Sequence, residues 1–240
     1  MRVAILSDIH GNRPALDAVE ADFAAIGVDL VVNLGDCVGG PIDPRGVMER
    51  LTERDWPTVR GNHDRHLYDR PDASLGPVDR FASAQLDGAH VEWLRSLPAT
   101  AVAADELFLC HGTPQSDTEP WLDNWWQGRT TSFPDEVTVA EKAAGLAFPV
   151  LLCGHTHLAR IVRLRDGRLI VNPGAVGLQM NHGAPDARYA VLERRQGRWS
   201  ASLRAVAYDI EAAARLAIEN GFPKWAEALR SGWLGHEGLF

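Results

Sequence analysis

Residues 3–36, VAILSDIHGNRPALDAVEADFAAIGVDLVVNLGD, decide the fold class of this chain. Residues 3–6 and 30–34 are continuous apolar runs of strand length, the pattern of strands that are buried on both faces. Between them, apolar residues recur at helical spacing: Leu16, Val19, Phe23 and Ile26. A strand, a helix and a second strand in this order predict two parallel strands joined by a crossover helix.

The chain continues this βα pattern and then becomes rich in hairpins. Asp43-Pro44 supplies an N-cap and a first-turn proline for a helix that reaches Leu51. Hairpin turns are expected at Asp166-Gly167 and Gln196-Gly197. Further elements are expected in this order: helices at 78–86 and 90–97, strands at 99–103, 107–110, 150–153, 160–164, 169–172, 189–192 and 199–206, and helices at 210–218 and 225–229. A βα half followed by a hairpin half predicts two facing sheets with helices on their outer sides.

The composition bounds the class of protein. The 240 residues are 45% hydrophobic, enough for one sizeable core, so we expect a single domain over residues 1–240. A net charge of -8 disfavours binding along a long nucleic acid or to an anionic membrane. Asp8 interrupts the N-terminal apolar run too early for a signal sequence, and no apolar run is long enough to span a membrane. Three widely spaced cysteines favour a reduced, cytoplasmic chain.

Side chains of metal-ligand type follow the apolar runs in five segments. They are Asp8-Ile9-His10, Gly35-Asp36, Gly61-Asn62-His63-Asp64, His111-Gly112 and Gly154-His155-Thr156-His157. Carboxyl ends of parallel strands share an edge, where sites are expected. Oxygen and imidazole donors together suit Mn²⁺, Fe or Zn²⁺, and carboxylates can bridge two cations.

The last of these segments carries the strongest single signal. His155 and His157 stand at i and i+2 after an apolar run, so an extended backbone would point both to the same side. An Asp-x-His or Gly-Asp pair alone is weak, since Asp is common in turns. Gly-Asn-His-Asp is intermediate, because a turn explains Gly and Asn but not the adjoining His. The occurrence of all five segments in one chain, in this order, makes the metal site much the better interpretation.

With these residues in view, the chain resembles the calcineurin-like metallophosphoesterases, whose motifs run D-x-H, G-D, G-N-H-D/E, H and G-H-x-H. All five occur in this order between residues 8 and 157. The resemblance implies an α/β fold: a four-layer α/β/β/α sandwich with two facing mixed sheets. Asn172-Pro173-Gly174 after a hairpin, together with GDCVG at 35–39, resembles the compact prokaryotic phosphodiesterase branch most closely.

The resemblance also implies two divalent metal ions, with manganese preferred and iron, zinc or nickel as alternatives. It assigns to the first ion the side chains of Asp8, His10, Asp36 and His157. It assigns to the second ion those of Asp36, Asn62, His111 and His155. Asp36 would then bridge the two ions, and a bridging hydroxide would attack phosphorus in line. His63 would stay free of metal and protonate the leaving group.

The chain departs from one branch of the family. Protein serine/threonine phosphatases extend Gly-Asp to G-D-x-V-D-R-G, where the second Asp orients the catalytic His and the Arg grips phosphate. Gly39 and Gly40 stand at those positions here, which weakens a phosphoprotein-phosphatase function and leaves open what orients His63. Asp64 is expected to face into its own turn. Arg60 could contact phosphate, although a surface role is the more common one for such an arginine.

Several aromatic and histidine residues allow two interpretations. Residues 113–135 lack clear periodicity and contain Trp121, Trp125, Trp126 and Arg129. They form either a lid or cap that offers aromatic faces to a nucleobase, or an anchor that packs an irregular loop or a dimer contact. We expect Cys37, Cys110 and Cys153 to be buried strand-end residues and not ligands. His182 could line the cleft, whereas His66, His90 and His236 are expected at the surface, and Trp225 and Trp233 in the packing of a terminal helix.

The expected function is hydrolysis of a small phosphodiester or phosphomonoester, such as a nucleotide, by a cytoplasmic enzyme that could be oligomeric. A dinucleoside polyphosphate hydrolase is the alternative among enzymes. An alternative of another class is a non-catalytic interaction scaffold, as the retromer subunit with this fold is regarded to be. Loss of the counterpart of His63 accompanies that role, whereas His63 and all the predicted ligands are present here.

Overall fold

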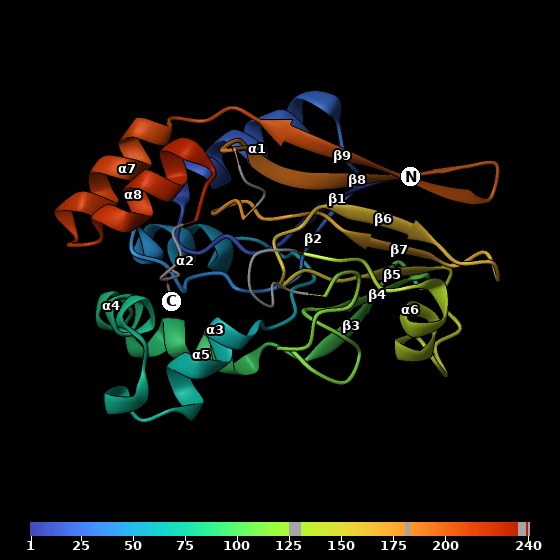
Figure 1. Ribbon diagram of the computed structural model, residues 1–240, viewed down its shortest axis with the longest axis horizontal. Coiled ribbons are helices and arrows are strands. Elements are labelled where there is room, and N and C mark those ends of the chain that lie inside the picture. The colour runs from blue at the N-terminus through green and yellow to red at the C-terminus, as the bar shows by residue number, and fades with distance from the viewer. Residues whose placement is uncertain (125–130, 181–182, 235–238, 240) are drawn as a thin grey trace.

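The computed structural model describes residues 1–124, 131–180, 183–234 and 239, and it contains two mixed β-sheets (Figure 1). The first sheet has the strand order β2-β1-β8-β9. Its strands are β1 (Arg2–Leu6), β2 (Leu30–Asn33), β8 (Ala187–Arg195) and β9 (Arg198–Val206). β1 is parallel to β2, with Val3 opposite Leu30, and antiparallel to β8. Helix α1 (Arg13–Ile26) is the crossover between the parallel pair, as the opening residues predict.

The second sheet has the order β3-β4-β5-β7-β6. Its strands are β3 (Thr100–Ala103), β4 (Leu107–Cys110), β5 (Val150–Leu152), β6 (Arg160–Arg163) and β7 (Leu169–Asn172). β4, β5 and β7 run parallel, whereas β3 and β6 are antiparallel edge strands. The hairpins predicted at Asp166-Gly167 and Gln196-Gly197 join β6 to β7 and β8 to β9.

Strand residues alternate between two hydrophobic layers, and this produces four layers of structure. Val3 and Ile5 pack between the two sheets against Leu107 and Leu109. Ala4 and Leu6 point the other way, toward α1 and α2 (Pro44–Thr52). On the far side of the second sheet, a third layer that includes Phe108 and Leu151 packs against α6 (Glu136–Lys142). The predicted α/β/β/α sandwich is therefore confirmed.

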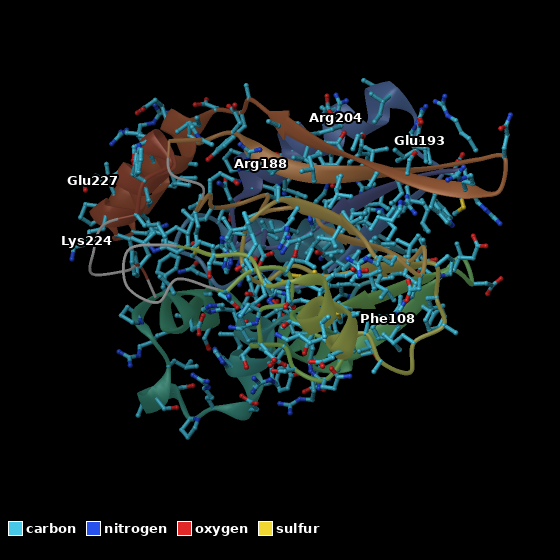
Figure 2. All side chains as sticks on the ribbon, turned by 45° about the vertical axis from the view of Figure 1, so that its right-hand side comes forward. Phe108, Arg188, Glu193, Arg204, Lys224 and Glu227 are labelled. Atoms are coloured by element: carbon cyan, nitrogen blue, oxygen red, sulfur yellow. The ribbon has the colours of Figure 1, made fainter. Side chains whose placement is uncertain are left out.

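The side chains of the central strands fill the space between the ribbons. In Figure 2, Phe108 lies on the lower side of the molecule, and Arg204 lies on the opposite, upper side with Glu193. Each core strand is apolar on both faces because each face is covered, one by the other sheet and one by helices. This explains the unbroken apolar runs of β1, β4 and β5.

The remaining helices gather beyond one end of the sheets, on the left in Figure 1. They are α3 (Asn62–Asp69), α4 (Pro77–Gln85), α5 (Gly88–Ser96), α7 (Ile210–Glu219) and α8 (Pro223–Ser231), with a short 3₁₀ helix at Asp72–Ser74. α4 and α8 share a hydrophobic cluster, and the rings of Phe81 and Phe222 lie 5.6 Å apart. Trp225 of α8 is buried, with its ring 6.3 Å from that of His10. The predicted packing role of Trp225 is therefore confirmed.

Two helices were not predicted, α3 and α6. Both carry few apolar residues: Leu67 and Tyr68 in α3, and Val137 and Val139 among the seven residues of α6. Among the described residues, no helix has the length and apolarity needed to cross a membrane.

Candidate metal centre

Two pairs of strand-end loops approach each other across the two sheets. After β1 and β2, backbone hydrogen bonds join Asp8 N to Gly35 O (2.9 Å) and His10 N to Asp36 O (3.0 Å). After β4 and β5, the segments that begin at His111 and Gly154 are joined by Gly154 N donating to His111 O (2.6 Å). The two sheets are linked where the backbone N–H of His155 donates to Asp8 Oδ2 (3.1 Å). Four of the five predicted segments thus meet at the seam between the sheets and not along the edge of a single sheet. The fifth joins them where the backbone N–H of His63 donates to Asp36 Oδ1 (2.8 Å).

Six of the predicted ligands form two compact buried groups. Within each group, one ligand atom per residue lies within 4.8 Å of the others. The first group consists of Asp8, His10 and His157, and the second of Asp36, His111 and His155. Asp36 Oδ2 lies between the groups, 3.2 Å from His111 Nε2 and 3.8 Å from His10 Nε2.

Asn62, the seventh predicted ligand, stands at the edge of the second group as the first residue of α3. In the orientation that satisfies its hydrogen bonds, its amide nitrogen donates to His155 Nδ1 (3.0 Å) and to Asp117 O (3.3 Å). Rotating the amide by half a turn brings its oxygen to the same place. Asn62 can therefore offer a hydrogen atom to His155 or an oxygen to a cation.

A backbone carbonyl fixes the orientation of each of the four imidazoles. Nδ1 of His10, His111 and His157 lies 2.6, 2.7 and 2.8 Å from the carbonyl oxygens of Gly39, Leu34 and Leu178, respectively. Nε2 of His155 lies 3.0 Å from Thr118 O. A carbonyl only accepts, so the nitrogen that faces it carries the hydrogen. In the neutral ring, the other nitrogen then presents a lone pair to the group.

These lone pairs face one another, which is the arrangement that a cation requires. His10 Nε2 and His157 Nε2 are only 3.1 Å apart. Asp8 Oδ1, fully buried, accepts no hydrogen bond from the described residues and lies 3.4 Å from His157 Nε2. Acceptors this close repel unless a proton or a metal ion lies between them. The donor set of imidazole, carboxylate and amide oxygen fits Mn²⁺, Fe or Zn²⁺.

Burial and mutual charge set the protonation of the two groups. Burial, reinforced by His157, lowers the pKa of His10 to about 3. Burial, reinforced by His111, lowers the pKa of His155 to about 4. Burial also acts to lower the pKa of His111, but Asp36 outweighs it and raises that pKa to about 10. The pKa of Asp36 is held well below its usual value because His111 and His63 outweigh the effect of burial. In the metal-free protein a proton on His111 thus occupies the position in which a cation would neutralise Asp36.

The backbone at this seam is strained. Among the described residues, eight other than glycine have a positive φ, and five of these are predicted ligands: Asp8, His10, Asp36, His155 and His157. Such a conformation costs roughly 1–3 kcal/mol per residue and tends to occur at functional sites. β5 ends at Leu152, so the prediction that His155 and His157 extend a strand and point to one side is wrong. With φ of 68° and 59°, the two histidines turn into different groups.

His63 lies beside the two groups and belongs to a third cluster. Its backbone N–H donates to Asp36 Oδ1 (2.8 Å), and its ring stands edge-on to that of His10, 5.3 Å away. Its Nδ1 lies 2.6 Å from Asp79 Oδ1, and Nδ1 of His66 lies 3.1 Å from Asp79 Oδ2. Burial acts to lower the pKa of His63, but Asp36 and Asp79 outweigh it and raise that pKa.

Sequence reasoning missed several residues of the site. His66 and His90 are buried, so the prediction that they lie at the surface is wrong. Asp79 belongs to no sequence motif that would indicate a functional role. It reaches His63 only because α4 packs against α3. Asp64 does turn inward at its helix start, as expected, but it also accepts from the backbone N–H groups of Asp36 and Cys37, both at 2.8 Å. The capping-type spacing of Gly61 and Asp64 was the signal that could have revealed the start of α3.

Of the other residues considered from sequence, some lie in the described part of the chain and some outside it. Trp121 is 1% exposed and donates to Val139 O (3.0 Å), which fits an anchor at this position. Arg60 is half-buried and donates to Leu97 O (3.3 Å). The three cysteines are free and buried as predicted, and burial raises their pKa values. The remaining residues lie outside the described part of the chain: Trp125, Trp126, Arg129, His182 and His236.

Known proteins place this geometry in a family. Residues 1–197 match the model of the calcineurin-like phosphoesterase superfamily domain. The uncharacterized protein MJ0912 of Methanocaldococcus jannaschii is 25% identical over 247 residues, which cover 93% of this chain and 94% of the relative. A metallophosphoesterase from Sphaerobacter thermophilus is 27% identical, with a TM-score of 0.77 over 97% of this chain and 100% of that one. The hypothetical protein PH1004 from Pyrococcus horikoshii OT3, 17% identical, has the same fold, with a TM-score of 0.80 over 98% of this chain and 99% of that one.

The family model covers most of the chain and includes all five motif segments. This confirms the family predicted from the motifs and, at the level of the family, the prediction of a phosphoesterase. The chain belongs to the calcineurin-like phosphoesterase superfamily.

Proposed function

We propose that this protein is a dimetal-dependent phosphoesterase that hydrolyses a small phosphodiester or phosphomonoester, such as a nucleotide. The observation that carries the proposal is the convergence of imidazole nitrogens and carboxylate oxygens in two adjacent buried groups, with His10 Nε2 and His157 Nε2 3.1 Å apart. Structural networks normally pair a donor with each acceptor. In the first group, Nδ1 of His10 and of His157 faces a backbone carbonyl, so both Nε2 atoms face inward as acceptors beside Asp8 Oδ1.

The ligand sets follow the two groups. Asp8, His10 and His157 would hold one ion, and His111, His155 and Asn62 the other. Asp36 would bridge the ions, because its Oδ2 lies between the two groups. Manganese is the first choice of metal, with iron, zinc and nickel as alternatives that the same donors accept. When bound, two divalent ions supply a water of lowered pKa and neutralise charge on the phosphoryl oxygens.

The side chains of this protein perform the remaining tasks. Backbone carbonyls hold each imidazole in one orientation, so little reorganisation accompanies the reaction. His63 is partly exposed, stands beside the first group and carries a raised pKa, as a general acid requires. Its proton passes to the leaving-group oxygen as the P–O bond breaks, a step worth roughly 10²- to 10⁴-fold in rate.

Turnover by metal-loaded protein tests the proposal. The metal-free protein is loaded with Mn²⁺, Fe²⁺, Zn²⁺ or Ni²⁺ and is offered bis-nitrophenyl phosphate, nitrophenyl phosphate and a dinucleoside tetraphosphate. We expect turnover of one of the first two and a metal content near two per chain. Preference for the tetraphosphate would instead favour the dinucleoside polyphosphate hydrolase. No turnover with any of the four metals would contradict the proposal and favour the interaction scaffold.

A pair of variants separates chemistry from folding in this assay. His63→Ala is expected to keep both metal ions and lose roughly 10²- to 10⁴-fold in kcat on a substrate with a poor leaving group. Asp87→Asn changes another carboxylate next to an imidazole, since Asp87, the N-cap of α5, pairs with His90 at 3.2 Å, and neither residue belongs to the two groups. It is expected to retain wild-type activity. Full activity of His63→Ala on that substrate with a poor leaving group would show that the assigned acid is wrong.

A further inference from the structure

We propose that Asp79 is the positioning residue of His63: α4 supplies the carboxylate that fixes which nitrogen of His63 faces the reacting groups. The inference rests on the proposed function and adds a residue that lies outside all five motif segments. Asp79 Oδ1 lies 2.6 Å from His63 Nδ1, the shortest hydrogen bond made by this imidazole in the described contacts. An ionised carboxylate only accepts, so Nδ1 carries the hydrogen and Nε2 exchanges the proton with the substrate.

The carboxylate of Asp79 is built into this position and does not reach it from the surface. Asp79 is 3% exposed, and its second oxygen is held by His66 Nδ1 at 3.1 Å. A buried Asp is costly unless each oxygen is paired, and here one imidazole pairs with each. His66 therefore fixes the plane of the carboxylate, and the carboxylate fixes the plane of the His63 ring.

Three neighbouring positions among the described residues do not orient the ring. A Cβ added to Gly39 would lie 2.5 Å from His63 Cβ, so no side chain fits there. Asp36 Oδ1 binds the backbone N–H of His63, which places the residue but not its ring. Asp64 is taken up by backbone N–H groups, including that of Gly61 at 3.0 Å.

The packing of α4 holds Asp79 in place from two sides. Val78 packs into the cluster that contains α7 and α8, and Phe81 contacts the ring of Phe222 before α8. Ala82, one turn after Asp79, packs instead into the cluster of the first sheet. Asp79 thus stands on a helix that is fixed by the core and by the C-terminal helices, so it can hold an imidazole to the tolerance that catalysis needs.

The dependence of rate on the leaving group tests this role. Nitrophenolate leaves without a proton, whereas an alkoxide needs one, so a defect in the acid affects alkyl esters selectively. We expect Asp79→Asn and Asp79→Ala to lower kcat on a dialkyl phosphodiester, which can release only an alkoxide, by roughly 10- to 100-fold and on bis-nitrophenyl phosphate by less than about 5-fold. His63→Ala should show the same selectivity, and the double variant should lose no more than His63→Ala alone. Asp87→Asn, the matched control, should change neither rate.

Equal losses on both substrates, or additive losses in the double variant, would overturn the proposal and show a merely structural role. A second measurement is independent of turnover: ¹⁵N–¹H spectra of the histidine rings of the metal-free protein. We expect a hydrogen-bonded Nδ1–H for His63 in the wild type and its loss in Asp79→Ala, with His111 unchanged. An unchanged His63 signal in Asp79→Ala would overturn the positioning role of Asp79, whether or not the wild type hydrolyses any of the substrates. Loss of the signal in a protein that hydrolyses none of them would support the positioning role and show that only the proposed function has failed.

Discussion

Asp36 is the residue at which the two ligand groups meet. It is 1% exposed and has a positive φ, and its two oxygens serve different partners, the backbone of His63 and the imidazoles of both groups. A Cβ at Gly61 would lie 2.1 Å from Asp36 Oδ1, so the segment that leads into α3 must have glycine at this position. One side chain thus couples the predicted metals to the position of the predicted acid.

Replacing this carboxylate should remove both metals. Asp36→Asn keeps the volume but removes the charge, and an amide is a poor bridge between two cations. We expect elemental analysis to find well below one metal per chain, compared with two in the wild type. Asp87→Asn serves as the control and should retain both. A full complement in Asp36→Asn would contradict the bridge.

A methyl group at position 39 should disturb His63 without removing metal. In Gly39→Ala the new Cβ would lie 2.5 Å from His63 Cβ, so the histidine must shift. We expect roughly a 10-fold or greater loss of kcat, in line with the sensitivity of catalysis to displacements of about 1 Å. Gly88→Ala is the matched control, because nothing lies within 4 Å of its added Cβ. Equal kcat values for the two variants would show that the contact is relieved without cost.

A residue can be singled out from sequence when its type is unusual for its place. A histidine beside Gly-Asn or two histidines after an apolar run are hard to explain as turns, so Asn62, His155 and His157 stand out. Asp79 does not, because one acidic residue near a helix start is ordinary. Its role arises only when α4 packs across α3, which no local pattern records.

At the scale of elements, strands were easier to predict than the helices around the site. β1, β4 and β5 are recognisable because both of their faces are covered by apolar layers. α3 is not, because its buried face is polar and includes Asn62, Asp64 and His66. Helical periodicity is recognised in a sequence by a stripe of apolar residues. A helix whose buried face carries the polar residues of a site has no such stripe.

The contact of α1 with the first sheet makes a pH-dependent contribution to stability. Asp22 of α1 accepts from Tyr189 Oη of β8 (2.5 Å) and from Arg204 Nε of β9 (2.7 Å). Its hydrogen bond with Arg204 lowers the pKa of Asp22 below the ordinary 3.8. The ionised form is therefore favoured in the folded state, and the stabilisation is present above pH 3.8 and lost as the pH falls through the lowered pKa.

Asp22→Asn should accordingly lower the free energy of unfolding by about 1 kcal/mol at pH 7. The difference from the wild type should shrink as the pH falls from about 3.8 through the lowered pKa of Asp22, because the carboxylate becomes protonated first in the unfolded and then in the folded chain. Urea unfolding at pH 7 and pH 3 measures both values. Asp17→Asn, which affects only an exposed pair with Arg13 on the same helix, should cost less than about 0.5 kcal/mol at either pH. A pH-independent difference for Asp22→Asn would contradict this account.

At the scale of the whole molecule, the proposed ligands come from both sheets, so bound metal would join the two halves of the sandwich. Asp8 and Asp36 follow strands of the first sheet, and His111 and His155 follow strands of the second. Ions held by both sets of ligands would bind the folded chain and not the unfolded one. This arrangement links metal affinity to global stability.

Metal should therefore raise the melting temperature. At a free Mn²⁺ concentration near 100 times Kd, the gain is about 2.7 kcal/mol, which corresponds to roughly 5–10 °C for a chain of this size. Calorimetry of chelator-treated protein with and without Mn²⁺ measures the shift. Asp36→Asn should show almost none. A shift of equal size in that variant would mean that the metal binds elsewhere.

The net charge of -8 is compatible with a phosphate substrate at this scale. Two divalent ions would bring four positive charges to a seam whose ligand carboxylates are Asp8 and Asp36. The net charge at the seam would then be positive although that of the whole chain is negative, because a bound ion dominates the nearby electrostatic field. Overall acidity still disfavours a long polyanion, which would contact the surface far beyond the seam.

The carbonyls that fix the four imidazoles have a consequence for how such a site tolerates mutation. The acceptors belong to Gly39, Leu34, Leu178 and Thr118, yet each is a main-chain oxygen that every amino acid possesses. Replacing Thr118 therefore leaves the acceptor chemically intact, and a scan of side-chain substitutions would pass over it. Insertions and deletions differ, since they displace the oxygen itself. The carbonyl acceptors around this centre thus tolerate side-chain substitutions but not insertions or deletions in the loops that carry them.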